Sequence, residues 1–494
     1  MTGTDAQPFW LVMDIRSAAS DVHSGLARFV IGLTRALVEV LASRRGQGEA
    51  KMSHVRILLI AKSEPPQWAV ELIQENPSVA SFWSGGPGAL TPTWDKPQYI
   101  WSSRVLRWVM KWSKGQFIWI APGNFDRPVL TRFLLPRALR SHIVQVIHDT
   151  IPIDQARSMS FFFRTQFSLL VRRTLAQFPV VCTVSEDSAQ RLFRLAPRRT
   201  QPLYVLPSGV ETIFGTRPRY QSAADLHSAR RSFLDILYAG SGGSFQVNSN
   251  LQKPSGEELD ALVRRRWIIG IGRSQKYKGW DLAEEVVHQM HSDLSEGIVL
   301  IRVGSDDDVS SKNARGNGAS ARKINHQNIS DHKSGFRVSR SDNGVVLNID
   351  SLPDEMLAQL YRCADLLVHP SQAEGFGFPP VEAALSGLPV VYRKGTAVDG
   401  HFRGHSFHPN FWQPIDSDNP AQWRDAIFAV LRNKSGLDEF MSDMSKAPYP
   451  RHFICQRGGG RDFRWTHAAD SLLSVLFSFQ QPSAQTSTPV EVVE

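Results

Sequence analysis

The chain has 494 residues, of which 42% are hydrophobic and 21% are charged, and its formal net charge is +9. This length favours two or more domains, and the composition is that of an ordinary globular protein. The charge would suit nucleic acid, anionic lipid or a phosphorylated substrate, and it does not choose among them. No apolar run reaches the roughly 18–20 residues of a membrane span, and the first residues lack the pattern of a secretory signal. Three scattered cysteines suit a reducing compartment, so we expect a cytoplasmic protein.

The first half of the chain alternates short apolar runs with longer mixed segments. Residues 26–41 have the apolar spacing of a helix. The runs that predict strands are 10–15, 55–61, 117–121, 143–147, 180–184 and 203–206. Such alternation indicates a parallel sheet covered by helices. We therefore expect an N-terminal Rossmann-like domain over residues 1–211.

The pattern lapses between residues 212 and 262, which we interpret as an interdomain connection with an insertion. It resumes over 263–455, which we expect to form a second Rossmann-like domain. The predicted strands there are 267–271, 298–303, 345–347, 366–369 and 389–392, and the predicted helices are 279–290, 354–363 and 380–386. Residues 305–344 and the tail 481–494 are polar enough that we expect disorder. Two such units should leave a cleft where ligands meet the carboxyl ends of the strands.

The densest motif begins at His369, where an apolar strand ends, and reads HPSQAEGFGFPPVEAALSGLPV. Gly375 and Gly377 permit a ligand to approach the backbone closely. A proline follows in the first turn of a predicted helix, whose amino end suits a diphosphate. Glu374 and Glu382, with seven residues between them, could flank that ligand. The alternative is that Glu382 only favours the helix dipole and Glu374 is solvated.

A second motif, IGIGRSQKYKG, follows the predicted strand 267–271. Arg273 and Lys278 in this loop suit phosphate oxygens, because arginine offers a planar fork and lysine a point charge. A dinucleotide-binding fingerprint fails here, because Gln275 occupies the third glycine position. A solvated basic loop is the alternative interpretation.

These two motifs resemble the retaining glycosyltransferases of the GT-B fold, specifically family 4, which includes bacterial mannosyl- and glucosyltransferases. The family signature is E-G-F-G-L-P-x-x-E-A-x-A-x-G-x-P-V, and this chain has Phe378 where Leu is common. The resemblance implies a GT-B fold, with two Rossmann-like domains facing a central cleft. It further implies that Glu374 lies against the donor sugar in the loop of Gly375, Phe376 and Gly377. In the family, the counterpart of Glu382 binds the ribose, and those of Arg273 and Lys278 hold the donor diphosphate.

Weaker pieces of the same resemblance lie elsewhere. The segment SGLARF resembles the family's G-I-G-R-Y, which implies that Gly25 approaches the phosphates, although Ala27 replaces the second glycine. The segment HDTIP resembles H-D-x-x-P, which implies a catalytic position for His148 beside the donor sugar; alone, such a pair is more often structural. The segment FRWTHAA, from Phe463, implies that a C-terminal helix over 456–480 crosses back to the N-terminal domain.

The resemblance also implies a metal-independent enzyme without a cofactor. Residues 306–308 are an acidic triple, but they lie in the polar insertion. The donor that we expect is GDP-mannose, and the acceptor is a glycan or lipid-linked oligosaccharide in surface-polysaccharide biosynthesis. The alternative is a scaffold protein that binds a nucleotide sugar without turnover. A nucleic-acid partner would explain the charge but neither motif.

Residues Tyr99–Trp119 mix four tryptophans with four cations. Such a mixture suits an anionic lipid interface, so this stretch could hold the protein peripherally at the inner face of the cytoplasmic membrane. A half-buried helix whose aromatic rings pack inward explains the same pattern. The sequence leaves both open.

Overall fold

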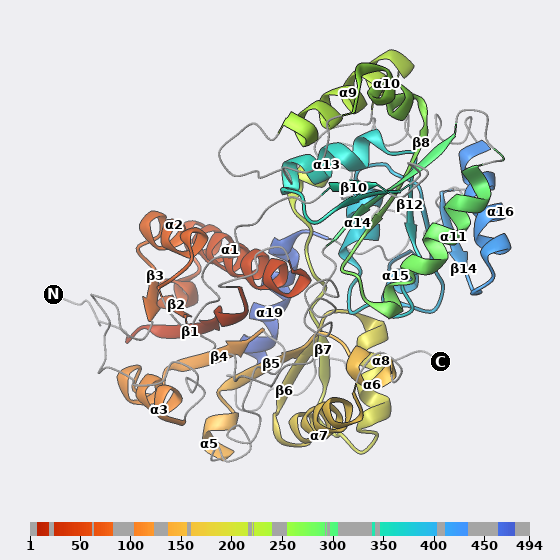
Figure 1. The fold of residues 1–494 in the computed structure, drawn as a ribbon. Coiled ribbons are helices and arrows are strands. Elements are labelled where there is room, and N and C mark those ends of the chain that lie inside the picture. Colours follow the sequence, from red (N-terminus) through yellow and green to blue (C-terminus); the bar gives the residue numbers. More distant parts are fainter. Residues whose placement is uncertain are drawn as a thin grey trace, which may run out of the picture. The chain divides into compact units, whose positions relative to one another are not determined.

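The computed structural model divides the chain into two compact units, which Figure 1 shows as a ribbon. The N-terminal domain comprises residues 1–211 and 462–494, and the C-terminal domain comprises residues 212–461. The residues described are 7–18, 24–61, 64–82, 103–122, 137–155, 160–215, 220, 222–239, 254–291, 293, 297–304, 338–340, 346–402, 411–432 and 463–479. The expected GT-B class, with two Rossmann-like domains, is confirmed.

The N-terminal domain is built on a seven-stranded parallel sheet in the order β3-β2-β1-β4-β5-β6-β7. Its strands are β1 Phe9–Asp14, β2 Val55–Ile60, β3 Val79–Phe82, β4 Phe117–Ala121, β5 Ile143–Ile147, β6 Val180–Thr183 and β7 Leu203–Val205. The central strands are almost continuously apolar and buried, as expected where helices cover both faces of a parallel sheet. Strand order reverses between β1 and β4, which makes the carboxyl ends of these strands the switch point of this sheet.

The helices of this domain include a C-terminal one that packs along the first. They are α1 Gly25–Gly46, α2 Gln67–Glu75, α3 Ser103–Trp112, α5 Arg137–Arg140, α6 Ile151–Asp154, α7 Phe161–Gln177, α8 Glu186–Leu195 and α19 Trp465–Phe479. The ring of Trp465 lies where any side chain at Gly32 or Gly209 would stand, at 2.1 and 2.4 Å from an added Cβ. Its Nε1 donates to Glu211 Oε1 at 3.1 Å. These contacts fix α19 within the N-terminal domain.

The described tryptophans of the Tyr99–Trp119 stretch pack inward. Trp119 lies in β4 and is 3% exposed. On α3, the ring of Trp112 stands 4.5 Å from that of Trp10 and stacks on Trp108 at 5.4 Å. Both rings of α3 pack against the buried core of the domain. The structure therefore favours the packed helix over the membrane contact at this stretch; residues 99–102 lie outside the described residues.

The C-terminal domain carries a second seven-stranded sheet, in the order β10-β11-β9-β8-β12-β13-β14, parallel except for β10. Its strands are β8 Arg266–Ile271, β9 Ile298–Val303, β10 Val338–Arg340, β11 Val346–Ile349, β12 Leu366–His369, β13 Val390–Arg393 and β14 Trp412–Ile415. Its helices are α9 Ala223–Ala239, α10 Gly256–Arg264, α11 Trp280–His291, α13 Asp354–Cys363, α14 Phe378–Leu385, α15 Ala397–Phe402 and α16 Pro420–Arg432. Strand order reverses between β8 and β12.

The prediction that residues 212–262 form an interdomain connection is wrong for the described part of that segment. Arg230 of α9 is 3% exposed and pairs with Asp365 at 2.6 Å, at the start of β12. The same guanidinium donates to the carbonyl oxygens of Cys363, Val263 and Arg265. Such a satisfied, buried arginine fixes α9 against the C-terminal domain, and α10 packs on α9.

Part of the insertion predicted to be disordered, 305–344, contains a strand. Residues 338–340 form β10, which pairs with β11 in antiparallel fashion. The rest of that insertion and the tail 481–494 lie outside the described residues. Among the described residues, no helix has both the length and the apolar character needed to cross a bilayer.

Candidate functional site

The two motifs of the C-terminal domain follow neighbouring strands. The loop after β8 carries Arg273 and Lys278, and the loop after β12 carries Glu374. Because β8 and β12 are hydrogen-bonded neighbours at the point where strand order reverses, both loops leave the sheet at its switch point. Open α/β sheets bind their ligands at this place. Topology thus brings together residues that lie 96 positions apart in the chain.

The loop after β8 turns tightly against the loop after β12. A short 3-10 helix, η5 Lys276–Lys278, ends at Gly279, whose φ of +72° is a left-handed conformation that favours glycine. A Cβ on Gly279 would stand 2.9 Å from the carbonyl oxygen of Pro370. In addition, the amide of Gln372 donates to the carbonyl of Tyr277 at 2.7 Å. The two loops are therefore held in one fixed arrangement before any ligand binds.

Glu374 lies at the centre of a compact charged cluster. Its Oε1 accepts from Lys278 Nζ at 2.6 Å and from His369 Nε2–H at 2.8 Å. The side chains of Lys278, Glu374 and His369 are 15%, 9% and 4% exposed, so water screens these contacts only partly. Burial opposes ionisation of Glu374, but Lys278 and His369 outweigh it and hold the pKa of this carboxyl well below its usual range. Glu374 is therefore ionised at neutral pH, beside the cation of Lys278.

The contact of His369 was not predicted from the sequence. His369 ends β12, and its ring turns back to the carboxylate five residues later. A histidine at a strand end followed by an acid after a short loop is the signal that could have indicated it. Arg273, by contrast, is exposed at the start of its loop, while its carbonyl accepts from Trp280 Nε1 at 3.0 Å.

Glu382 lies in the interior and not at the surface of the loop. It is 1% exposed, and its Oε2 accepts from the hydroxyl of Tyr361 on α13 at 2.8 Å. Glu382 is thus hydrogen-bonded to α13, and no contact among the described residues joins it to Glu374. Contact with a ribose would require access to this carboxylate.

The amino end of α14 offers fewer amides than the sequence interpretation assumed. Phe378 opens the helix, and Pro379 and Pro380 follow in the first turn, where proline has no N–H to donate. An anion here would have to rely on loop amides and on the side-chain cations. Gly377 caps the helix with a φ of +83°. Phe376 is buried, and its carbonyl accepts from His401 Nε2–H at 2.8 Å, which anchors the loop to α15.

The N-terminal residues lie in the other domain, and each has local contacts. Gly25 is exposed at the start of α1, directly after the cap residue Ser24. His148 follows β5, is 9% exposed, and lies 2.5 Å from the carbonyl of Pro122 through Nε2. Burial lowers the pKa of His148 to about 4, against the opposing effect of that hydrogen bond. The imidazole is therefore neutral at pH 7 with its Nε2–H donated to backbone, which favours a structural role.

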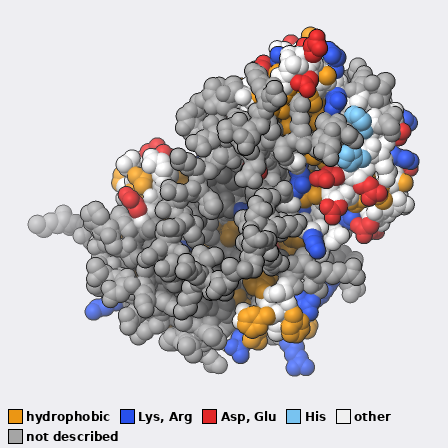
Figure 2. All heavy atoms as spheres, viewed as in Figure 1, with side chains coloured by type: hydrophobic (Ala, Val, Ile, Leu, Met, Phe, Trp, Pro, Cys, Tyr) orange, Lys and Arg blue, Asp and Glu red, His pale blue; other side chains and the backbone are white. Residues whose placement is uncertain are grey.

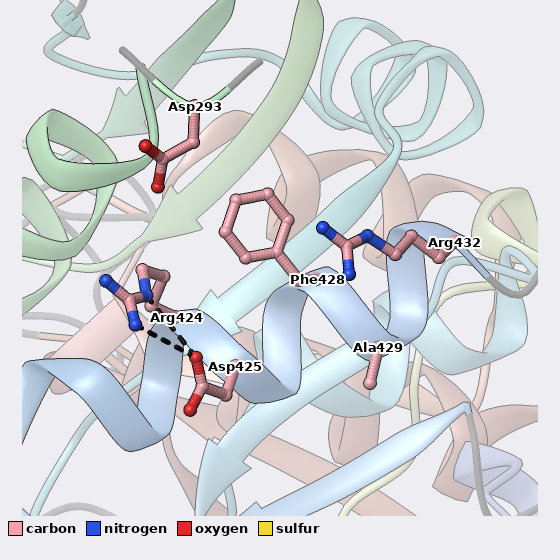
Figure 3. A pocket seen from close by; sticks show the side chains of 6 residues that line it. All are labelled: Asp293, Arg424, Asp425, Phe428, Ala429 and Arg432. Carbon is pink, nitrogen blue, oxygen red and sulfur yellow. Dashed lines mark hydrogen bonds and ion pairs between the residues drawn. The ribbon is translucent and has the colours of Figure 1, made fainter.

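A pocket of about 450 Å³ lies elsewhere on the C-terminal domain (Figure 3). It is lined by Asp293, Arg424, Asp425, Phe428, Ala429 and Arg432. These residues belong to α16 and to the turn after α11, helices that run back from the carboxyl edge of the sheet. Its Arg424 and Asp425 pair with one another at 3.3 Å. Among the described residues, no group of three or more histidine, cysteine or acidic side chains could hold a metal ion.

Comparison with known proteins finds a family that the region of this site resembles. Residues 257–446 match the family described as glycosyl transferases group 1. The matched region contains both loops and the whole charged cluster. The match covers less than half of the chain, so it shows that this region resembles the group 1 glycosyl transferases.

Curated relatives match a short part of the chain. A D-inositol 3-phosphate glycosyltransferase of Mycobacterium tuberculosis is 31% identical over 150 residues, and its counterpart in Mycobacterium bovis matches equally. That alignment covers 26% of this chain and 25% of the relative, so the chain spans about a quarter of the curated relatives.

Solved structures resemble the chain over nearly its whole length. HepE from Anabaena, solved with UDP and glucose, has a TM-score of 0.56 at 14% identity, covering 95% of this chain and 100% of that one. Sucrose-phosphate synthase from Thermosynechococcus elongatus has a TM-score of 0.57 at 15% identity, covering 96% and 100%. WaaG, a glycosyltransferase involved in lipopolysaccharide biosynthesis, has a TM-score of 0.53 at 12% identity, covering 94% and 99%. At such identities, these likenesses establish the fold alone.

Proposed function

We propose that this protein is a retaining glycosyltransferase that moves a hexose from a nucleotide sugar to a glycan or lipid-linked acceptor. The observation that carries the proposal is the cluster of Lys278, Glu374 and His369 at the switch point of the C-terminal sheet. The cluster places an ionised carboxylate beside a lysine cation, so the cation can meet the diphosphate and the carboxylate can meet the sugar. Arg273 opens the same loop and adds a second cation.

In the proposed reaction, the bond between the anomeric carbon and the diphosphate oxygen breaks, and the electron pair leaves with the diphosphate. Lys278 and Arg273 stabilise the negative charge that develops there, the kind of preorganised stabilisation that is often the largest catalytic contribution. Glu374 accepts hydrogen bonds from sugar hydroxyls and favours positive charge at the anomeric carbon. The acceptor hydroxyl attacks the same face, and its proton passes to a phosphate oxygen of the departing diphosphate.

Lysine has three N–H donors, so Lys278 can hold Glu374 and a phosphate oxygen at once. Since two cations meet the diphosphate charge, we propose that the reaction needs no metal. Excess EDTA should leave turnover unchanged. Loss of activity that added Mg²⁺ or Mn²⁺ restores would overturn this part of the proposal.

For the donor we propose GDP-mannose, on the basis of the HDTIP and EGFGFP segments together. UDP-glucose is the second donor to compare, because HepE from Anabaena was solved with it. For the acceptor we propose a glycan or lipid-linked oligosaccharide of surface-polysaccharide biosynthesis, at the inner face of the cytoplasmic membrane.

Release of nucleoside diphosphate from a panel of nucleotide sugars, without acceptor, tests the proposal. We expect one donor to be hydrolysed well above background, and Glu374→Gln to abolish that hydrolysis. Binding of a donor with no release, with or without candidate acceptors, would favour the scaffold alternative. NMR of a transferred sugar then tests retention: an anomeric configuration opposite to the donor's contradicts the proposed face of attack.

A further inference from the structure

Helix α7 of the N-terminal domain presents an unusual outer surface. It opens with three consecutive phenylalanines, Phe161, Phe162 and Phe163, which are 74%, 71% and 45% exposed. Leu169, two turns further along, is 51% exposed. Exposed apolar side chains that occur singly need no explanation, but four of them on one helix do.

The helix cap and the contacts of α7 with the domain core hold this helix, and with it the exposed side chains, in a fixed position. Ser160 caps the first turn, where its hydroxyl accepts from the amide of Phe163 at 3.3 Å. The opposite face of α7 is buried in the domain core through Phe167, Leu170, Val171, Thr174 and Leu175. Phe162 and Leu169 lie seven residues apart, two helical turns, on the outer side. The core contacts therefore hold the apolar outer surface in place.

All the charged side chains of α7 are positive. Its sequence, FFFRTQFSLLVRRTLAQ, contains three arginines and no acid. Arg172 and Arg173 are exposed on the last turns of the outer side, and Arg164 lies over the ring of Phe161 at 5.6 Å from its centroid. In Figure 2, orange side chains bordered by blue ones lie where Figure 1 places α7. Apolar side chains next to arginines, on a helix that has no acidic residue of its own, match the boundary between headgroups and acyl chains of an anionic bilayer.

We propose that the outer surface of α7, formed by Phe161, Phe162, Leu169, Arg172 and Arg173, docks the protein on an anionic membrane. Phe161, Phe162 and Leu169 enter the interfacial region, and the arginines meet lipid phosphates. The helix stays folded on its core, so the attachment is peripheral and reversible. The inference goes beyond the proposed reaction, since docking needs neither donor nor acceptor.

Co-sedimentation of the full chain with vesicles of phosphatidylcholine and phosphatidylglycerol tests this surface. Wild type should bind these vesicles at low salt, bind pure phosphatidylcholine vesicles weakly, and keep part of its binding at high salt because the apolar contribution is not screened. Arg172→Gln with Arg173→Gln should lower partitioning about 30-fold at low salt, since each cation near an anionic surface contributes about a factor of five. Phe161→Gln with Phe162→Gln should remove the binding that survives high salt.

Two control variants remove exposed cations or an exposed apolar side chain outside α7. Lys111→Gln with Lys114→Gln deletes two exposed cations from the stretch whose tryptophans pack inward, and Ile236→Gln deletes a 44% exposed apolar side chain on α9. Both should bind vesicles like wild type. If the lysine variant loses binding and the arginine variant keeps it, the membrane surface lies at α3 and the proposal for α7 is wrong.

Light scattering separates membrane docking from self-association. A wild-type dimer that Phe161→Gln with Phe162→Gln converts to monomer, together with absence of vesicle binding, would assign the surface to a second copy of the chain and overturn the proposal. Donor hydrolysis without acceptor should be unchanged in every variant. Vesicle binding by a protein that hydrolyses no donor would leave this surface standing and reject only the proposed reaction.

Discussion

Replacing Lys278 by methionine tests the role of the charged cluster most directly, because methionine keeps the length of the aliphatic stem and removes the charge. Lys278 Nζ lies 2.6 Å from Glu374 Oε1 and 5.4 Å from the ring centroid of Tyr277. A lysine has three donors, so a diphosphate would gain a charge-assisted hydrogen bond without breaking the contact to Glu374. Such a bond contributes about 1.5–3 kcal/mol, which predicts a roughly 10- to 150-fold weaker Kd for a nucleoside diphosphate.

The control is Lys276→Met, which removes an exposed cation from the same 3-10 helix. Titration calorimetry should show that Lys278→Met weakens GDP or UDP by this factor and the corresponding nucleoside by much less. Lys276→Met should change both ligands by less than a factor of about three, as expected for an exposed charge in high dielectric. Equal losses for the two variants, or equal losses for diphosphate and nucleoside, would refute the assignment of Lys278 to the diphosphate.

Three further predictions concern individual residues. Glu374→Gln should abolish transfer in a protein that still unfolds cooperatively; near-normal turnover would remove this carboxylate from the mechanism. His369→Ala should lower kcat more than it raises KM, because it frees the Glu374 carboxylate to rotate, and His369→Gln should restore part of the loss; equal kcat in all three proteins would reduce His369 to packing. His148 is neutral when folded, so protons favour the unfolded chain as the pH falls. The free energy of unfolding should drop by about 3 kcal/mol between pH 6.5 and 4, and His148→Gln should flatten that drop in urea titrations at successive pH values.

The sequence was informative about strands because the buried ones are short apolar runs. The runs at 117–121, 143–147, 298–303 and 366–369 coincide with β4, β5, β9 and β12. Strands β3 and β14 were not predicted, because each is only four residues long and keeps just part of its length buried. The packing of α9 escaped prediction for another reason: it depends on Arg230, a charged residue whose partner Asp365 lies 135 positions away.

Some features of the site could likewise be predicted from the sequence, and others could not. That Lys278 and Glu374 share one end of the sheet follows from two strand-end loops and the rules of parallel topology. What a motif cannot show is which way a side chain turns. Glu382 was expected at the ligand because it belongs to the signature, yet it lies under Tyr361 in the interior. Likewise, prolines at 379 and 380 suggested a helix start, and the same prolines remove the amides that an anion would use.

The contacts between the two loops reduce the conformational entropy that the site loses when it binds a ligand. Lys278 and Glu374 are held by a backbone hydrogen bond between Gln372 and Tyr277, and by the close approach of Pro370 to Gly279. A side chain at Gly279 would need both a left-handed backbone and room that the Pro370 carbonyl already fills. The positions of cation and anion are therefore fixed by main-chain contacts and not by the ligand. Because groups held in place before binding cost little reorganisation when charge develops, such a site can stabilise a departing diphosphate more strongly than mobile surface charges could.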